Sequence, residues 1–190
     1  MENRIIDMVR KLPKRFETYT IDKLTDNASF AYVRGYIDNL SNNLKTGKGL
    51  FLYGANGIGK TGALACVHHA VKARRIEWGA KERMWCRARD IALSYGYFYT
   101  DETFDESVDH LYNTCAWLVV DELGRESDIK NYERRLHSLL SSRRDNMVVT
   151  SFTSNLSLMK IQEIYGNGFY SMLHETCYIV ECDGPDRRII

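Results

Sequence analysis

Eight consecutive residues have the types and spacing of a phosphate-binding loop. They match the pattern G-x-x-x-x-G-K-[ST] in full: Gly54, Ala55, Asn56, Gly57, Ile58, Gly59, Lys60 and Thr61. A further small residue, Gly62, follows them. Glycines let the backbone turn tightly, so that successive N–H groups face a phosphate. Lys60 would reach the β- and γ-phosphates of ATP, and the Thr61 hydroxyl would bind Mg²⁺. A glycine-rich turn without a ligand is the alternative, but the apolar run before the loop and the helical pattern after it favour nucleotide binding.

Two adjacent acids follow a later apolar run. Asp121 and Glu122 come directly after the run 116–120. A phosphate loop needs a second, acidic strand end to organise the metal and the attacking water. We expect Asp121 to hold the Mg²⁺ shell and Glu122 to polarise the water as general base. Strand ends are often polar, so the pair is informative because it follows a complete phosphate loop.

Asn155 closes a third apolar run, 147–152, which continues into Thr153 and Ser154. An amide at this point could touch the γ-phosphate or the water and report hydrolysis. In the alternative, Ser154 or Asn155 caps the next helix. We favour the sensor role because the segment lies one strand–helix unit after Asp121.

These side chains need a sheet whose strands end at one edge. Short apolar runs predict strands at 50–53, 84–86, 116–120, 147–152 and 178–182. Helical patterns cover 59–75, 88–95, 104–112, 129–144 and 157–175, the last interrupted by Gly166 and Gly168, and an amphipathic helical stretch, 1–45, is broken at Pro13. The alternation predicts an α/β fold with a largely parallel sheet covered on both faces.

The composition agrees with one ordinary domain. The chain has 190 residues, is 44% hydrophobic and carries a net charge of +1, which excludes a histone-like basic protein. We expect residues 1–45 to form a helical segment that packs on an ATPase core at 46–190. Without an apolar run of about 18 residues or a signal-peptide pattern, we expect no membrane partner and a cytoplasmic location. The five scattered cysteines are expected to be reduced and buried.

The near-zero charge conceals an uneven layout. Seven cations fall within 18 positions: Lys72, Arg74, Arg75, Lys81, Arg83, Arg87 and Arg89. They could track a DNA backbone while nearby rings stack on bases, namely Trp78, Trp85, Tyr95, Tyr97 and Tyr99. The alternative is a solvated helix end with core aromatics, and Trp85 is expected in the core. The acidic segment 95–109 is expected to be a surface insertion that could dock a basic partner.

Two other pairs have simpler interpretations. His68 and His69 are adjacent in a predicted helix, where neighbouring side chains diverge, so they cannot form a metal pair. Arg143 and Arg144 end a predicted helix, where positive charge suits the helix dipole.

Several of these motifs together resemble a known family. They are the run 12–16 (Leu-Pro-Lys-Arg-Phe), the run 20–24 (Thr-Ile-Asp-Lys-Leu), the phosphate loop, the run 120–124 (Val-Asp-Glu-Leu-Gly) and the run 153–155 (Thr-Ser-Asn). They resemble the AAA+ domain of the DnaC/DnaI-type replicative helicase loaders, and the related IstB transposition ATPases are similar. The resemblance implies a P-loop NTPase of AAA+ (ASCE) type, with a five-stranded parallel sheet of order 5-1-4-3-2 and no separate lid domain. It also implies ATP and Mg²⁺ as ligands and single-stranded DNA as a partner.

The end of the chain carries a further resemblance. The run 184–188 (Gly-Pro-Asp-Arg-Arg) is similar to the family's terminal Gly-x-Ser-x-Arg, with Asp186 in place of serine. This implies that Arg188 is the cis-acting basic residue near the nucleotide, with Arg187 as a competitor.

One departure from the family pattern concerns hydrolysis. In such oligomers each site is completed by a neighbour's arginine, which lies in the helix before the fifth strand. The corresponding stretch here is 166–173, and from Leu156 to Glu181 there is no arginine and only one lysine, Lys160. A trans arginine can be worth about 10³–10⁵ in rate. We therefore expect ATP binding with weak ATPase activity, unless a homo- or hetero-oligomer completes the site.

The leading functional hypothesis is an AAA+ protein of DNA replication. It would act as a helicase loader or a loader-like protein, with a replicative helicase or its loader and single-stranded DNA as partners. The first alternative is an IstB-like transposition ATPase subunit. The second is a non-catalytic modulator that binds a host replication factor.

Overall fold

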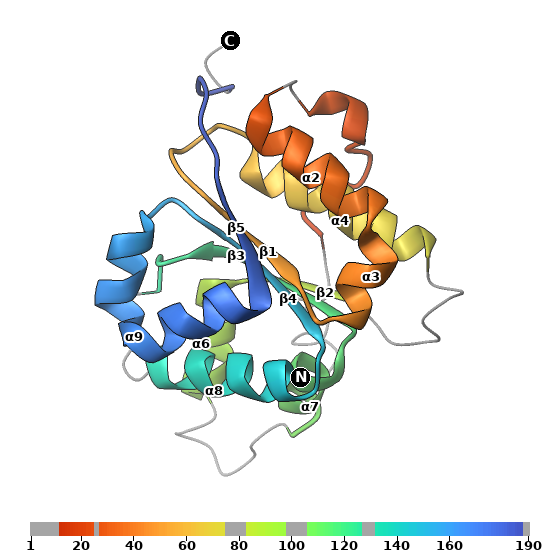
Figure 1. The fold of residues 1–190 in the computed structure, drawn as a ribbon. Coiled ribbons are helices and arrows are strands. Elements are labelled where there is room, and N and C mark those ends of the chain that lie inside the picture. The colour runs from red at the N-terminus through yellow and green to blue at the C-terminus, as the bar shows by residue number, and fades with distance from the viewer. Residues whose placement is uncertain (1–11, 25–26, 75–82, 98–105, 127–131, 188–190) are drawn as a thin grey trace.

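The computed structural model describes residues 12–24, 27–74, 83–97, 106–126 and 132–187 (Figure 1). Its centre is a sheet of five strands: β1 (Gly49–Tyr53), β2 (Arg83–Arg87), β3 (Trp117–Leu123), β4 (Val149–Ser154) and β5 (Cys177–Glu181). The strands lie in the order β2-β3-β4-β1-β5, and every pair is parallel. This confirms the predicted order 5-1-4-3-2, here given from the other edge.

Helices cover both faces of this sheet, as the alternating pattern predicted (Figure 1). One face carries α2 (Ala28–Asp38), α3 (Leu40–Lys45) and α4 (Lys60–Ala73). The other carries α6 (Ala88–Tyr97), α7 (Glu106–Thr114), α8 (Tyr132–Asp145) and α9 (Leu158–Thr176). Because parallel strands need a crossover connection, each strand enters at the same edge and ends at the same opposite edge.

Alternation along the strands builds a separate core on each face. Trp117 and Val119 of β3 pack in the cluster under α2 and α4, whereas Leu118 and Val120 pack in the cluster under α6 to α9. All four side chains are buried. Successive side chains of a strand point to opposite faces, so this apolar run fills both cores at once.

The segment before α2 differs from the prediction. Two short 3₁₀ helices, η1 (Lys14–Phe16) and η2 (Ile21–Lys23), stand where a continuous helical stretch was expected. Pro13 precedes η1, and Thr20 between the two turns is extended, with φ −108° and ψ 161°. Phe16, Tyr19 and Ile21 pack against the core cluster beside α4. These tertiary contacts override the weak helical pattern of the sequence. Residues 1–11 of the predicted segment lie outside the described residues.

Two other boundaries differ for identifiable reasons. β3 continues through Asp121 and Glu122 to Leu123, whereas the predicted strand ended at residue 120. The extension contains a β-bulge, because the pairing with β4 shifts register between Val120 and Leu123. α9 has a break at Gly166, where φ is 82° and ψ is 169°. The predicted interruption is therefore present, and the two halves of α9 meet at a kink (Figure 1).

The cysteines confirm their predicted state. All five are buried and none forms a disulfide. Burial raises the pKa of the Cys66 thiol to about 11 and that of Cys177 to about 12, so both are neutral thiols. Among the described residues, no helix combines the length and the apolar character that a membrane crossing requires.

Candidate nucleotide-binding site

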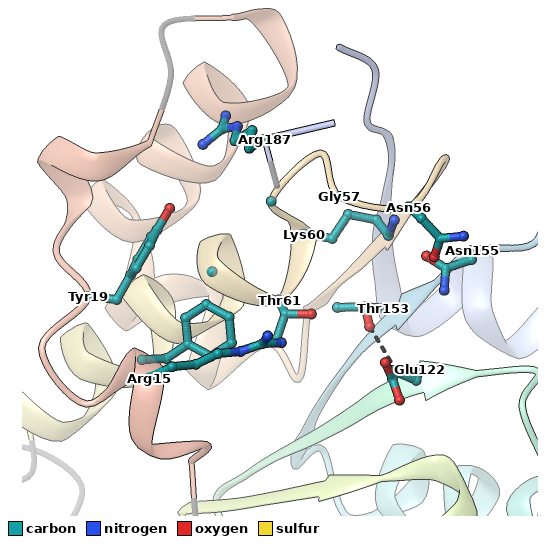
Figure 2. A pocket seen from close by; sticks show the side chains of 13 residues that line it. Arg15, Tyr19, Asn56, Gly57, Lys60, Thr61, Glu122, Thr153, Asn155 and Arg187 are labelled. Atoms are coloured by element: carbon teal, nitrogen blue, oxygen red, sulfur yellow. Dashed lines mark hydrogen bonds between the residues drawn. The ribbon is translucent and has the colours of Figure 1, made fainter. Parts of the chain in front are cut away.

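A pocket of about 220 Å³ lies at the edge of the sheet where the strands end (Figure 2). Its inner wall consists of the phosphate loop and the ends of β3 and β4: Asn56, Gly57, Gly59, Lys60, Thr61, Gly62, Glu122, Thr153 and Asn155. Its outer wall consists of four residues from the segment before α2 and the end of the chain: Arg15, Phe16, Tyr19 and Arg187. The structure thus brings together phosphate-loop residues, Glu122 and Asn155, which are up to about a hundred positions apart in sequence.

The phosphate loop turns between β1 and α4 through left-handed glycines. Gly57 has φ 79°, and Gly59, the N-cap of α4, has φ 104°. Other residues rarely adopt such angles, so these positions require glycine. The loop is anchored by Ile58, whose side chain is buried in the core under α4. The N-terminus of α4 consequently opens into the pocket, where its dipole favours a bound anion.

Lys60 is the first residue of α4 and folds back over the loop. Its ammonium group donates hydrogen bonds to the carbonyl oxygens of Gly54 at 2.8 Å and Ala55 at 2.6 Å. The side chain is buried yet lines the pocket. A buried ammonium group needs polar partners, and the two carbonyls provide them.

Asp121 lies beneath Thr61 and is almost fully buried, with 4% of its surface exposed. Its Oδ1 accepts hydrogen bonds from the hydroxyls of Thr61, at 3.1 Å, and Thr153. Burial raises the pKa of Asp121, and the two hydroxyl donors oppose that shift. Carboxylate and hydroxyl oxygens are hard ligands of the kind that Mg²⁺ prefers. The donor set of Asp121 and Thr61 therefore fits a magnesium ion.

Glu122 has a backbone conformation that sequence alone does not indicate. Its φ is 62°, which is uncommon for a residue other than glycine. The conformation belongs to the bulge of β3 and is held by the Glu122 N–H, which donates to the Thr153 hydroxyl at 2.9 Å (Figure 2). The carboxylate lines the pocket and lies 3.4 Å from the Arg125 guanidinium. A bulge re-aims side chains, so two adjacent acids can serve one site.

Asn155 follows β4 and lines the pocket at the same edge (Figure 2). The alternative that Ser154 or Asn155 caps the next helix is wrong. The N-cap of α9 is Ser157, whose side chain accepts a hydrogen bond from the Lys160 N–H. The Ser154 hydroxyl instead donates to the Leu123 carbonyl at 2.7 Å, which ties the ends of β3 and β4 together.

The outer wall packs directly on α4. A Cβ atom added to Gly62 would lie 2.9 Å from the Tyr19 ring, so the ring lies directly against the first turn of the helix. Phe16 stacks edge-on against Tyr19, with ring centroids 5.5 Å apart. The Phe16 carbonyl accepts a hydrogen bond from His69 Nε2 of α4 at 2.9 Å. These rings present aromatic faces at the mouth of the pocket, on which a planar ring could stack.

Arg187 completes the outer wall. Its backbone N–H donates to the Gly57 carbonyl at 3.2 Å, and its guanidinium lies 5.0 Å from the centre of the Phe30 ring. The preceding Asp186 carboxylate lies against Gly57, since a Cβ on that glycine would fall on it. Of the two arginines expected near the nucleotide, Arg187 lines the pocket, and Arg188 lies outside the described residues.

From the sequence, no role in the site was assigned to four of the lining residues. They are Arg15, Phe16, Tyr19 and Thr153. Arg15 lies in a motif that carried the resemblance, and Thr153 precedes the predicted sensor by two positions, so both had a signal. Tyr19 had none, because its place depends on the packing of η1 and η2 on α4.

The described cations of the basic stretch lie on different elements of the fold. Lys72 and Arg74 lie at the C-terminal end of α4, whereas Arg87 ends β2 at the edge that carries the pocket. Trp85 is buried, as expected for a core residue, and cannot stack on a base. Of the remaining residues of the DNA hypothesis, Arg75, Trp78, Lys81 and Tyr99 lie outside the described residues.

Arg143 lies in the last turn of α8, as predicted, but it has a further role. Its guanidinium is fully buried. It donates hydrogen bonds to the Thr150 hydroxyl at 2.8 Å, the Val149 carbonyl at 2.6 Å and the Tyr112 carbonyl. Burial lowers the pKa of Arg143, and these acceptors keep the charged group in the core. The sequence did not indicate this burial, because the acceptors come from other elements, α7 and β4.

Comparisons with known proteins agree with this arrangement. No family model and no curated protein matches the sequence. Among solved structures, a DnaI structure is similar with a TM-score of 0.75 at 19% identity, over 97% of this chain and 100% of that one. A DnaC helicase loader is similar with a TM-score of 0.74 at 23% identity, over 90% of this chain and 100% of that one.

A replication initiator, DnaA bound to AMPPCP and single-stranded DNA, is also similar. Its TM-score is 0.70 at 16% identity, over 89% of this chain and 51% of that one. The chain therefore has the fold of the DnaC/DnaI-type AAA+ domains, which confirms the fold implied by the sequence motifs.

Proposed function

We propose that this chain is an ATP-binding AAA+ protein of DNA replication that acts as a helicase loader or a loader-like protein. One observation carries the proposal: an anion-binding loop, a Mg²⁺-type donor set, a second acid and an amide converge on one pocket. The fold shared with a DnaC helicase loader and with DnaI supports the replication context.

The inner wall has a suitable group for each part of ATP hydrolysis. The loop N–H groups and the α4 N-terminus would bind the β-phosphate, and Lys60 would exchange its two carbonyl partners for phosphate oxygens. Thr61 and Asp121 would hold Mg²⁺, which when bound neutralises charge on the β- and γ-oxygens. Glu122 would accept a proton from the attacking water as the bond to the leaving ADP oxygen breaks. Asn155 would orient that water or the γ-phosphate.

The outer wall has a suitable surface for the base and ribose. Tyr19 lies over Gly62, next to the magnesium ligand Thr61, so a nucleotide whose phosphates occupy the loop would extend its sugar and base toward Tyr19 and Phe16. Arg187, against Gly57 and Phe30, would lie close to the phosphates from the other end of the chain.

We expect hydrolysis by the isolated chain to be weak. No arginine occurs between Leu156 and Glu181, where a neighbouring subunit's contribution to the site was expected. Phe169, in the stretch that corresponds to this position, is buried in the core. Glu122 is also engaged by Arg125, which must release it before it can act as a base. ATP binding would then serve as a switch that a partner completes.

DNA and helicase engagement belong to the same proposal. A structure of DnaA with single-stranded DNA shows that a similar fold can accompany that ligand. On this chain, Arg87 ends β2 at the edge that carries the pocket, and Arg89 follows in the first turn of α6. Both are exposed. Cations there could contact a DNA backbone, and binding should then weaken as salt is raised.

A pull-down with nucleotide control tests the proposal. We expect wild-type protein with Mg²⁺·ATP to retain a hexameric replicative helicase or its loader, and Glu122→Gln to retain it at least as well because ATP stays intact. Retention of a transposase instead would favour a transposition ATPase. Vigorous ATPase activity of the isolated chain that rises with protein concentration would contradict the expectation that the chain hydrolyses ATP weakly by itself.

The absence of an arginine in 156–181 favours one second candidate, a non-catalytic modulator that restrains a host replication factor. Retention of a helicase loader with no turnover in the complex would support it. Turnover that appears only when the partner is added would support the primary proposal.

A further inference from the structure

Arg15 has an unusual position for an arginine outside the predicted site. It lines the pocket, and its side chain extends toward Thr61 in the close view (Figure 2). Its guanidinium lies 4.6 Å from the centre of the Phe16 ring. With the described residues it forms no hydrogen bond and no ion pair, so this stacking contact is what holds the group.

Three arginines elsewhere in the described residues have polar partners. Arg125 pairs with Glu122, Arg144 pairs with Asp145, and Arg143 has its acceptors in the core. A guanidinium has five donors in a fixed fork that fits phosphate oxygens. Stacking on one ring leaves this fork available at the mouth of a phosphate-binding pocket.

The backbone that carries Arg15 is fixed relative to the phosphate loop. Phe16 N–H donates to the Pro13 carbonyl at 2.8 Å, which closes the η1 turn. The next contact, His69 Nε2 to the Phe16 carbonyl, ties that turn to α4, the helix that begins at Lys60. Leu12, on the other side of Arg15, is buried in the core cluster. The side chain therefore emerges from a held turn rather than from a loose end.

We propose that Arg15 binds the terminal phosphate of a nucleoside triphosphate from within the same chain. This inference rests on the proposed function, because it assumes that nucleotide phosphates occupy the loop. Glu122 lines the inner wall and Asp121 is buried behind Thr61, and the negative charges of these carboxylates oppose a γ-phosphate. A guanidinium opposite them offsets that repulsion and adds charge-assisted hydrogen bonds. Arg15 would thereby make the pocket prefer a triphosphate to a diphosphate.

The test compares binding of AMPPCP and ADP, each with Mg²⁺, by isothermal titration calorimetry on the full chain. We expect Arg15→Ala to weaken AMPPCP about tenfold or more, since a charge-assisted contact is lost, and to change ADP binding by less than about twofold. Arg15→Lys should recover part of the AMPPCP affinity because the positive charge remains. Lys14→Ala, which removes an exposed neighbouring cation that does not line the pocket, should change neither.

Three outcomes separate the possibilities. An equal loss for AMPPCP and ADP in Arg15→Ala would overturn the proposal, because Arg15 would then serve the base or ribose. If Arg15→Ala bound both AMPPCP and ADP as tightly as the wild type does, the proposal would also be overturned. If the wild-type chain binds neither nucleotide, the proposed function itself fails and this inference fails with it.

Discussion

The two walls of the pocket are built in different ways. On the inner wall, Lys60, Thr61 and Asp121 hold one another or the loop backbone through hydrogen bonds, and the ends of two neighbouring strands support them. On the outer wall, contacts are mainly between rings, with single hydrogen bonds from His69 and from the Arg187 backbone. We infer that the inner wall binds phosphate in a rigid geometry, whereas the outer wall adds smaller, separable contributions to affinity.

Removing the inner-wall cation should have the largest effect. We expect Lys60→Ala to weaken Mg²⁺·AMPPCP about a hundredfold, because the charged contact to the phosphates is lost. Lys72→Ala, an exposed lysine at the other end of α4, is the matched control and should bind normally. Fluorescence titration with a labelled nucleotide measures both. Similar affinities for the two variants would mean that the loop is not the anion site.

Removing a ring of the outer wall should have a smaller effect that does not depend on the number of phosphates. We expect Tyr19→Ala to weaken AMPPCP and ADP alike, by about tenfold, because base–aromatic stacking is lost. Tyr19→Phe should bind almost normally, because the hydroxyl only contacts the Lys23 carbonyl at 3.3 Å. If Tyr19→Ala lost affinity for AMPPCP but not for ADP, the outer wall would contribute to phosphate binding, which would contradict the separate roles of the two walls.

The attachment of the outer wall to α4 should matter less still. His69→Leu removes the donor to the Phe16 carbonyl, and we expect an affinity loss of about threefold for both nucleotides. His69→Gln can restore a donor and is the matched variant. The same calorimetric titration applies. A loss as large as that of Lys60→Ala would show that the two walls are not separable.

Replacing His68, a buried residue of α4, should have the smallest effect on nucleotide affinity, although both walls of the pocket contact this helix. His68 is buried between Trp85 and Trp117, and burial, followed by the charge of Arg83, lowers its pKa to about 3. Below pH 6.5, His68 of the unfolded chain binds a proton, whereas the buried His68 of the folded chain does not. The free energy of unfolding therefore falls as the pH decreases from 6.5 toward 3. The slope is about 1.4 kcal/mol per pH unit.

Urea unfolding at several pH values tests this. His68→Leu should show a shallower fall in the free energy of unfolding between pH 6.5 and 4, with nucleotide affinity at pH 7.5 unchanged. Equal slopes for the variant and the wild type would contradict the effect of burial on His68.

The sequence was most informative where local pattern and chemistry coincide. The strand order, both helical layers and the convergence of phosphate loop, Asp121 and Glu122 could be predicted, because apolar runs mark buried strands and parallel strands end at one edge. The segment 12–24 could not, since Phe16 and Tyr19 take their places by packing on α4 rather than from local propensity. The positive φ of Glu122 follows from its bond to Thr153, a partner 31 residues away.

Arg143 shows the same limit for charged residues. Its position at a helix end was predicted, but its burial was not, because its acceptors Tyr112 and Val149 come from other elements and hold its guanidinium in the core. Arg15, by contrast, lies between Leu12 and Phe16, which pack in the core cluster, yet its own side chain lines the pocket. The sequence alone does not tell a buried arginine from one that lines the pocket, because only the tertiary structure shows which arginine has acceptors.

The central claim is that the inner wall is a Mg²⁺-dependent ATP site, and calorimetric titration of the purified chain with AMPPCP tests it most directly. We predict micromolar binding with Mg²⁺ present, and at least about tenfold weaker binding with excess EDTA, because Thr61 and Asp121 then lack the ion that joins them to the phosphates. Absence of binding up to millimolar AMPPCP with Mg²⁺, or affinity that does not depend on Mg²⁺, would contradict the account.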